Sequence, residues 1–184
     1  MNTIMIGIEI FLIIILLCLL IFFSPTTIKA VLIGGPFVPT PKPVIRKALK
    51  LANLKPDEKF CDLGSGDGRS LIIASKEFKA KTYGFEYAIP LYSISKLNLF
   101  IHQTKNSVVY RRNFYKADIS EADVIFLYLT PKAFKKLENK LKQELKPGTR
   151  VVTFSSSLPF WNPQKIVSLK ENGDNINIYL YVKS

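Results

Sequence analysis

A glycine-rich stretch with two carboxylates is the part of this sequence best suited to chemistry. Asp62-Leu63-Gly64-Ser65-Gly66-Asp67-Gly68-Arg69 follows a strand-like apolar run and precedes a helix-like segment. Its glycines can adopt positive φ and let a ligand approach the main chain closely. A phosphate-binding loop places Lys and Ser or Thr after its glycines, and this stretch lacks that arrangement. Carboxylates beside a bare backbone instead suit a ligand with an ammonium or sulfonium group and hydroxyls, such as S-adenosylmethionine. A glycine-rich turn without a ligand is the alternative.

A second acidic position strengthens the cofactor interpretation. Lys81-Thr82-Tyr83-Gly84-Phe85-Glu86 is typical of a strand, and Glu86 ends it about twenty residues after the glycine loop. A carboxylate at that position can accept hydrogen bonds from both ribose hydroxyls of a nucleoside. Together, the loop and Glu86 predict a nucleoside cofactor.

The elements around these residues alternate between strand and helix. After the strand that leads into the glycine loop, strands are expected over 81–86, 107–112, 124–129 and 150–154, with a closing antiparallel hairpin of 165–170 and 176–182. Helices are expected over 42–54, 70–78, 89–103 and from 131 to about 145. In the helix over 89–103, the residues predicted to face the sheet include Leu91, Ile94, Leu97 and Ile101. This alternation predicts an α/β fold with a mostly parallel, doubly wound sheet.

The candidate binding residues share one feature of this topology. The glycine loop, Glu86, Asn113 and Thr130 all fall at carboxyl ends of expected strands. Ligands of such sheets bind outside those ends. One site therefore accounts for all of these residues.

The N-terminal part of the chain differs from the rest in composition. Residues 4–23 are almost entirely apolar except for Glu9, and as a helix they would match the ~30 Å hydrocarbon core of a bilayer. We therefore expect a transmembrane anchor over 4–23, a Pro-rich linker over 24–43 and one catalytic domain over 44–184. A cleaved signal peptide is the rival interpretation, but no basic residue precedes the run. The excess of basic residues after it predicts a single-pass membrane protein with its domain in the cytoplasm.

Charge, cysteine and histidine content restrict the partners. The formal net charge is +12, which favours lipid headgroups, nucleic acid or an acidic protein. Cys18 and Cys61 are not placed to form a disulfide, which is typical of a reducing compartment. His102 is the only histidine, and no metal-ligand cluster is evident, so we expect no metal.

The motifs together resemble the seven-stranded class I S-adenosylmethionine-dependent methyltransferases. More narrowly, the sequence resembles the ATP synthase c-subunit lysine methyltransferase family and its prokaryotic relatives. The shared segments are the N-terminal apolar run, Pro36-Phe37-Val38-Pro39, the glycine loop, Leu137-Glu138-x-Lys140-Leu141, Arg150-Val151-Val152 and Pro159-Phe160-Trp161-x-Pro163. Two positions depart from the family: Asn113 stands where relatives often carry Asp, and Tyr87-Ala88-Ile89-Pro90 replaces an Asn-Pro pair closer to the Glu.

The resemblance implies a role for each candidate residue. The glycines Gly64, Gly66 and Gly68 would approach the methionine part of the cofactor, and Asp62 with Asp67 would hold its ammonium end or ordered water. Ser65 would also belong to the cofactor-binding residues. Glu86 would bind the ribose, while Asn113 and Phe114 would bracket the adenine. The acceptor pocket would be formed by Tyr128, Thr130 and Pro131.

The expected activity is methyl transfer to a protein lysine close to a membrane. One alternative is an RNA, DNA or small-molecule methyltransferase. Nucleic acid is not favoured, because the fourth strand ends in Tyr-Leu-Thr-Pro and not in the Asn/Asp-Pro-Pro-Tyr/Phe of adenine amino-group methylation. The other alternative is a membrane protein that binds the cofactor without catalysis.

Overall fold

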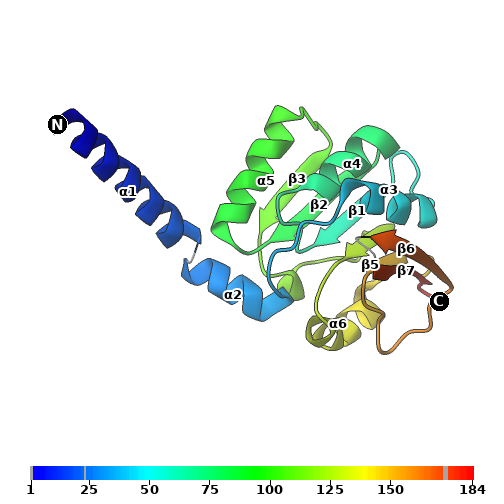
Figure 1. Cartoon of the computed structure of the whole chain (residues 1–184). Helices are drawn as coiled ribbons and strands as arrows, with labels where there is room; N and C mark the ends of the chain where they lie inside the picture. Colours follow the sequence, from blue (N-terminus) through cyan, green and yellow to red (C-terminus); the bar gives the residue numbers. More distant parts are fainter. Residues whose placement is uncertain (1, 23, 172–173) are drawn as a thin grey trace.

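The computed structural model describes the backbone of residues 2–22, 24–171 and 174–184 and centres on one seven-stranded sheet (Figure 1). Its strands are β1 (Lys59–Leu63), β2 (Lys81–Glu86), β3 (Ser107–Arg111), β4 (Val124–Leu127), β5 (Arg150–Phe154), β6 (Lys165–Glu171) and β7 (Asp174–Val182). Apolar, β-branched and aromatic residues dominate most of these strands, as expected for a sheet covered by helices.

The strand order is β3-β2-β1-β4-β5-β7-β6. β1 to β5 pair in parallel, whereas β7 runs antiparallel between β5 and β6. The predicted seven-stranded sheet with a C-terminal antiparallel hairpin is therefore confirmed. Residues 172 and 173 of the hairpin turn lie outside the described residues.

Helices cover both faces of the sheet. Buried side chains of α3 (Lys42–Leu51), α4 (Arg69–Phe78) and α5 (Ile89–Ile101) pack on one face. The short 3₁₀ helix η1 (Phe114–Lys116) and α6 (Pro131–Glu144) pack on the other, where Phe134, Leu137 and Leu141 are buried. Cys61 is buried as a free thiol in this second layer, and the side chain of Cys18 lies outside the described part.

The helix α1 (Asn2–Phe22) projects away from the sheet domain (Figure 1). Within the described part of the chain, no helix combines the length and the apolar character needed to cross a membrane. The expected transmembrane helix over 4–23 is therefore wrong. The cytoplasmic orientation of the domain stays a prediction.

Two further expectations differ from the structure. Residues Pro25–Gly34, predicted to belong to a Pro-rich linker, form the helix α2, which Ser24 caps by accepting a hydrogen bond from the Thr27 N–H. In α5, Ile94, Leu97 and Ile101 face solvent and not the sheet, whereas Ser95 and Leu99 are buried. The first difference brings α2 beside the glycine loop, and the second leaves an apolar helix face open.

Candidate active site

The glycine loop joins β1 to α4 and carries positive φ angles at its glycines. At Gly66, φ is +55°, and an added Cβ would lie 2.4 Å from a ring carbon of Phe37. At Gly68, which caps α4 in the left-handed conformation, an added Cβ would lie 2.4 Å from Ser95 Oγ of α5. Only glycine permits both the backbone conformation and these close approaches.

Glu86, at the end of β2, binds the loop directly. Its Oε2 accepts the Gly66 N–H at 3.0 Å, and its Oε1 accepts the Ala88 N–H at 2.8 Å. Burial raises the pKa of this carboxyl, and the backbone hydrogen bonds, which favour the charged form, oppose that rise. The carboxylate therefore fixes the position of the loop relative to the start of α5.

Asp62 lies at the end of β1 and is almost completely buried. Its carboxylate accepts a hydrogen bond from the Ser70 hydroxyl of α4. Burial raises the pKa of Asp62 to about 7, and the negative charges of Glu86 and Asp67 add to the rise. A cationic ligand beside Asp62 would reverse this effect, because it favours the charged carboxylate.

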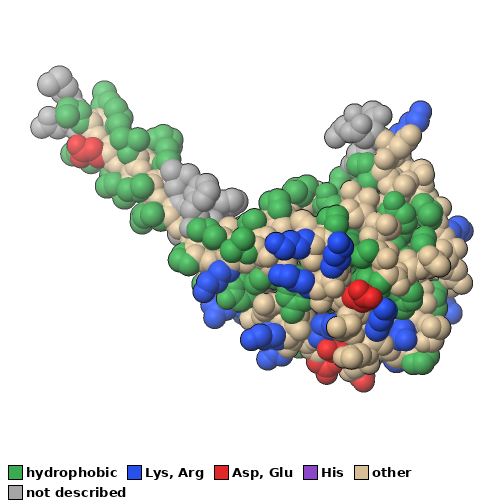
Figure 2. All heavy atoms as spheres, turned by 90° about the horizontal axis from the view of Figure 1, so that it is seen from below, with side chains coloured by type: hydrophobic (Ala, Val, Ile, Leu, Met, Phe, Trp, Pro, Cys, Tyr) green, Lys and Arg blue, Asp and Glu red, His purple; other side chains and the backbone are tan. Residues whose placement is uncertain are grey.

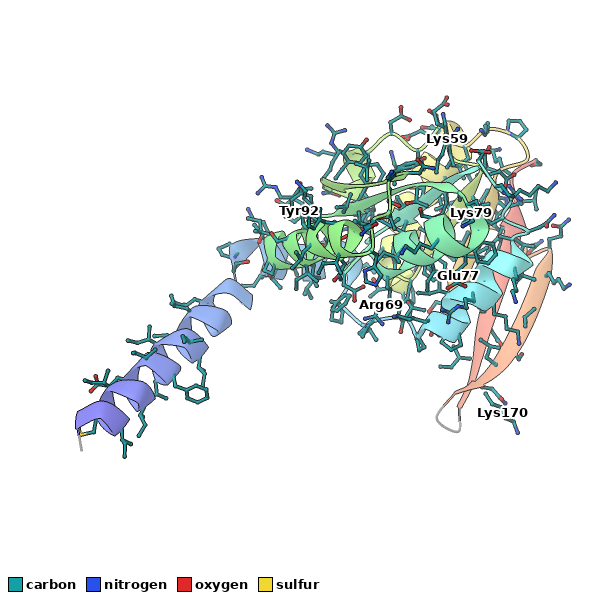
Figure 3. All side chains as sticks on the ribbon, turned by 90° about the horizontal axis from the view of Figure 1, so that it is seen from above. Lys59, Arg69, Glu77, Lys79, Tyr92 and Lys170 are labelled. Atoms are coloured by element: carbon teal, nitrogen blue, oxygen red, sulfur yellow. The ribbon has the colours of Figure 1, made fainter. Side chains whose placement is uncertain are left out.

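Asp67 already has a cationic partner. Its Oδ2 lies 2.6 Å from Nη2 of Arg69, and Arg69 Nη1 donates to the Thr40 carbonyl at 3.2 Å. Arg69 lies close to the N-terminal end of α3, as Figure 3 shows. Asp67, which was predicted to bind an ammonium group, therefore already pairs with Arg69. The same arginine binds the segment that precedes α3.

Residues 33–40, which we call the strap, run from the last turn of α2 toward the start of α3 and line one side of the site. The Ile33 carbonyl accepts from the Tyr115 hydroxyl at 2.9 Å, and the Gly34 carbonyl accepts from the Thr130 N–H at 3.1 Å. The Thr40 carbonyl is held by Arg69. The strap is thus fixed at both ends across the carboxyl edge of the sheet.

The strap, α2 and the strand ends enclose a narrow cavity of about 100 Å³. Of the predicted residues, those on its lining are Asp62, Gly64, Ser65, Gly66, Asp67, Glu86, Phe114 and Tyr128. The sequence reasoning missed the apolar lining contributed by Val31, Phe37, Phe85 and Leu129, and also Tyr87. The Pro36-Phe37-Val38-Pro39 motif is the sequence feature that could have indicated that the strap lines the site.

Four predicted residues do not line this cavity. Gly68 supports α4 and contacts α5. The Asn113 side chain caps η1, because its Oδ1 accepts the Tyr115 N–H at 3.0 Å. Thr130 caps α6 by accepting the Ala133 N–H, and Pro131 is the first residue of that helix. Of the three residues assigned to the acceptor pocket, only Tyr128 therefore reaches the cavity.

The cavity has the chemistry that an adenosyl sulfonium needs. Ser65 Oγ is buried in its lining without a hydrogen-bond partner in the described part of the chain, so it remains available to a ligand. Asp62 and Glu86 supply carboxylates for an ammonium group and for hydroxyls. Phe85, Phe114 and Leu129 supply apolar walls for a nucleoside. The residues present therefore fit S-adenosylmethionine.

Comparisons with known sequences agree with this chemistry. The profile of the ANTKMT methyltransferase domain matches residues 62–165. A protein-lysine N-methyltransferase of Saccharolobus islandicus is 37% identical over 153 residues, which cover 80% of this chain and 92% of that protein. The adenine nucleotide translocase lysine N-methyltransferase of Mus musculus is 30% identical, and 78% of this chain matches 62% of its length. The ATP synthase c-subunit lysine N-methyltransferase of Homo sapiens is 29% identical, with coverage of 79% and 60%.

Solved structures give the same fold. An RNA methyltransferase from Salinibacter ruber, crystallised with S-adenosyl-L-homocysteine, superposes with a TM-score of 0.75 at 34% identity. The match covers 79% of this chain and 93% of that chain. TrmN from Thermus thermophilus superposes with a TM-score of 0.68 at 14% identity and supports the fold alone.

Proposed function

We propose that this chain, which belongs to the ANTKMT methyltransferase domain family, transfers methyl groups to lysine side chains of proteins. The chain is an S-adenosylmethionine-dependent methyltransferase. When bound, the cofactor supplies an electrophilic methyl group on its sulfonium. The observation that carries the choice of acceptor is the similarity to the Saccharolobus islandicus protein-lysine N-methyltransferase, which extends over 92% of that protein.

The site residues divide into those that hold the donor and those that enclose the reaction. Gly66, Glu86 and Asp62 form the donor side, where a bare backbone meets two buried carboxylates. Phe37 and Tyr128 belong to the lining that encloses the other side. Fixing donor and acceptor in line can lower the barrier by about 7–11 kcal/mol, so positioning is the main task of such a site.

A lysine acceptor must also lose its proton before it attacks. Apolar surroundings favour the neutral amine, because burial disfavours the charged form. The lining of this cavity contains the apolar residues Val31, Val38, Phe85 and Leu129, and Val38 belongs to the strap. We infer that desolvation under the strap, together with a wall formed by Tyr128, prepares the amine.

The first experiment is a labelling assay with the full chain. Purified enzyme is incubated with tritiated S-adenosylmethionine and with separate membrane and soluble protein fractions, and labelled bands are digested and sequenced by mass spectrometry. We expect label on lysine, and the two fractions test the further expectation that the acceptor is membrane-proximal. A Glu86→Ala variant should lose most of the labelling, whereas Glu77→Ala, which removes a surface carboxylate of α4, should retain it.

RNA methylation is the second candidate. It is favoured by the net charge of +12 and by the 34% identity to the Salinibacter ruber RNA methyltransferase. The same assay with total RNA separates the two functions. Label that is lost after ribonuclease treatment, with RNA binding that weakens steeply with salt, would replace the lysine proposal.

A further inference from the structure

Helix α5 presents a large apolar face to solvent. The exposed fractions are 44% for Ile94, 56% for Leu97, 79% for Phe100 and 60% for Ile101. We call these four residues the apolar stripe; their spacing places them along one side of the helix. Contiguous exposed apolar side chains of this size mark an interaction surface in most proteins.

The opposite side of α5 explains why the apolar stripe faces outward. Ser95 is completely buried where α5 crosses the glycine loop, and its Oγ lies 2.4 Å from the position of an added Cβ on Gly68. Such a close approach requires a small residue on the helix. Contact with the glycine loop therefore determines which side of α5 packs on the domain, and the bulkier side chains of the apolar stripe stay exposed to solvent.

Helix α2 lies against α5 and also exposes apolar side chains. The two helices are in contact, and the Ile89 N–H donates to Thr26 Oγ1 at 3.4 Å. Figures 1 and 3 show α2 next to the N-terminal end of α5, at the point where α1 leaves the domain. On α2, Ile28 and Leu32 are also exposed.

The charges on these two helices are exclusively positive. α2 contains Lys29 and α5 contains Lys96, and neither helix contains Asp or Glu. Neither lysine takes part in an ion pair within the described part of the chain. Figure 2, which shows the other side of the domain from below, has more Lys and Arg than Asp and Glu side chains there as well, so the basic character is not confined to these two helices.

We propose that the apolar stripe and the exposed side of α2 rest on the surface of an anionic lipid bilayer. Apolar side chains flanked by lysines and free of carboxylates are the pattern of helices that lie in a membrane interface. The contact runs along the surface and requires no spanning helix. A second copy of the chain fits less well, because a symmetric contact would bring lysines of both copies together.

This orientation has a consequence for the active site. Thr27, Ala30 and Val31 of α2 and Leu91 of α5 line the cavity, so the proposed contact adjoins its rim. The cavity would open close to the lipid headgroups. The inference concerns binding alone and does not rest on the identity of the methyl acceptor.

The first test locates the contact with tryptophan in the full chain. Wild type contains only Trp161, so Phe100→Trp adds a reporter on α5, and Ile166→Trp adds a matched reporter at an exposed position of β6. Vesicles of phosphatidylcholine with phosphatidylglycerol carry brominated acyl chains as quenchers. We expect the added fluorescence of Phe100→Trp to be quenched and that of Ile166→Trp to be unaffected. Equal quenching of the two, or none at position 100, would overturn the proposal.

The second test measures affinity. The double substitution Leu97→Glu with Phe100→Glu should weaken binding to the anionic vesicles by about tenfold or more, since it removes apolar contacts and adds repelled charges. Ile166→Glu should leave the affinity unchanged, and thermal melting checks that all variants fold. Binding to pure phosphatidylcholine with the same affinity would contradict the role of the lysines. A lipid-free dimer that the double substitution dissociates in sedimentation velocity would assign the surface to a second copy.

Discussion

Glu86 and Gly66 lie twenty residues apart in the chain, and Oε2 of the glutamate accepts the backbone N–H of the glycine at 3.0 Å. The other carboxylate oxygen accepts the Ala88 N–H. One side chain therefore holds the glycine loop and the first turn of α5 in a fixed relation at the mouth of the cavity. The site is therefore preorganised for a ligand that binds both the glycine loop and Glu86.

Removal of this carboxylate should reduce cofactor affinity. We expect Glu86→Ala to weaken binding of S-adenosylhomocysteine by about tenfold or more, because a charge-assisted hydrogen bond is lost and the loop loses its support. Glu86→Gln, which keeps one acceptor oxygen, should show a smaller loss. Isothermal calorimetry measures both, with Glu77→Ala as the surface control. Unchanged affinity of Glu86→Ala would refute the assignment of Glu86 to the cofactor.

A Cβ at position 66 should cause both backbone strain and a clash with Phe37. Gly148→Ala, which causes strain without a clash, distinguishes the two effects. Gly66→Ala places a methyl group against Phe37 at a φ of +55°, whereas Gly148→Ala imposes similar strain at +86° with no atom within 4 Å. We expect both variants to lose about 1 kcal/mol or more of stability from backbone strain. Only Gly66→Ala should also lose cofactor affinity in calorimetry. Equal affinity losses in the two variants would show that strain alone is responsible.

The strap should loosen when its bond to η1 is removed. Tyr115→Phe deletes the hydroxyl that donates to the Ile33 carbonyl at 2.9 Å, a loss of about 1 kcal/mol for a typical hydrogen bond. We expect faster hydrogen exchange of the amides in residues 33–40, with unchanged exchange in β6 and β7. If exchange in the strap stays at the wild-type rate, Thr130 and Arg69 hold the strap without Tyr115.

Sequence patterns predicted the parallel sheet and the donor side of the site because these depend on local features. A glycine loop after a buried strand and an acid at the end of the next strand occupy neighbouring places in any parallel sheet. The strap could not be predicted in this way, since its position depends on the distant partners Thr130 and Tyr115. The face of α5 was mispredicted because this helix is apolar on both sides, so its periodicity does not select one. The deciding contact is between Ser95 and Gly68, two small residues that carry no periodic signal.

Asp62 should make the stability of the folded chain depend on pH. Burial raises its pKa from the ordinary value of 3.8 to about 7, so between these values the folded state holds a proton that the unfolded state has released. The contribution of Asp62 to stability is therefore fully present below about pH 4 and is lost as pH rises to about 7, with a slope of up to about 1.4 kcal/mol per pH unit for one proton. Asp62→Asn cannot titrate, so its urea-unfolding free energy should fall less steeply across this range. Parallel stability curves for wild type and Asp62→Asn would show that the Asp62 carboxyl does not retain its proton in the folded state.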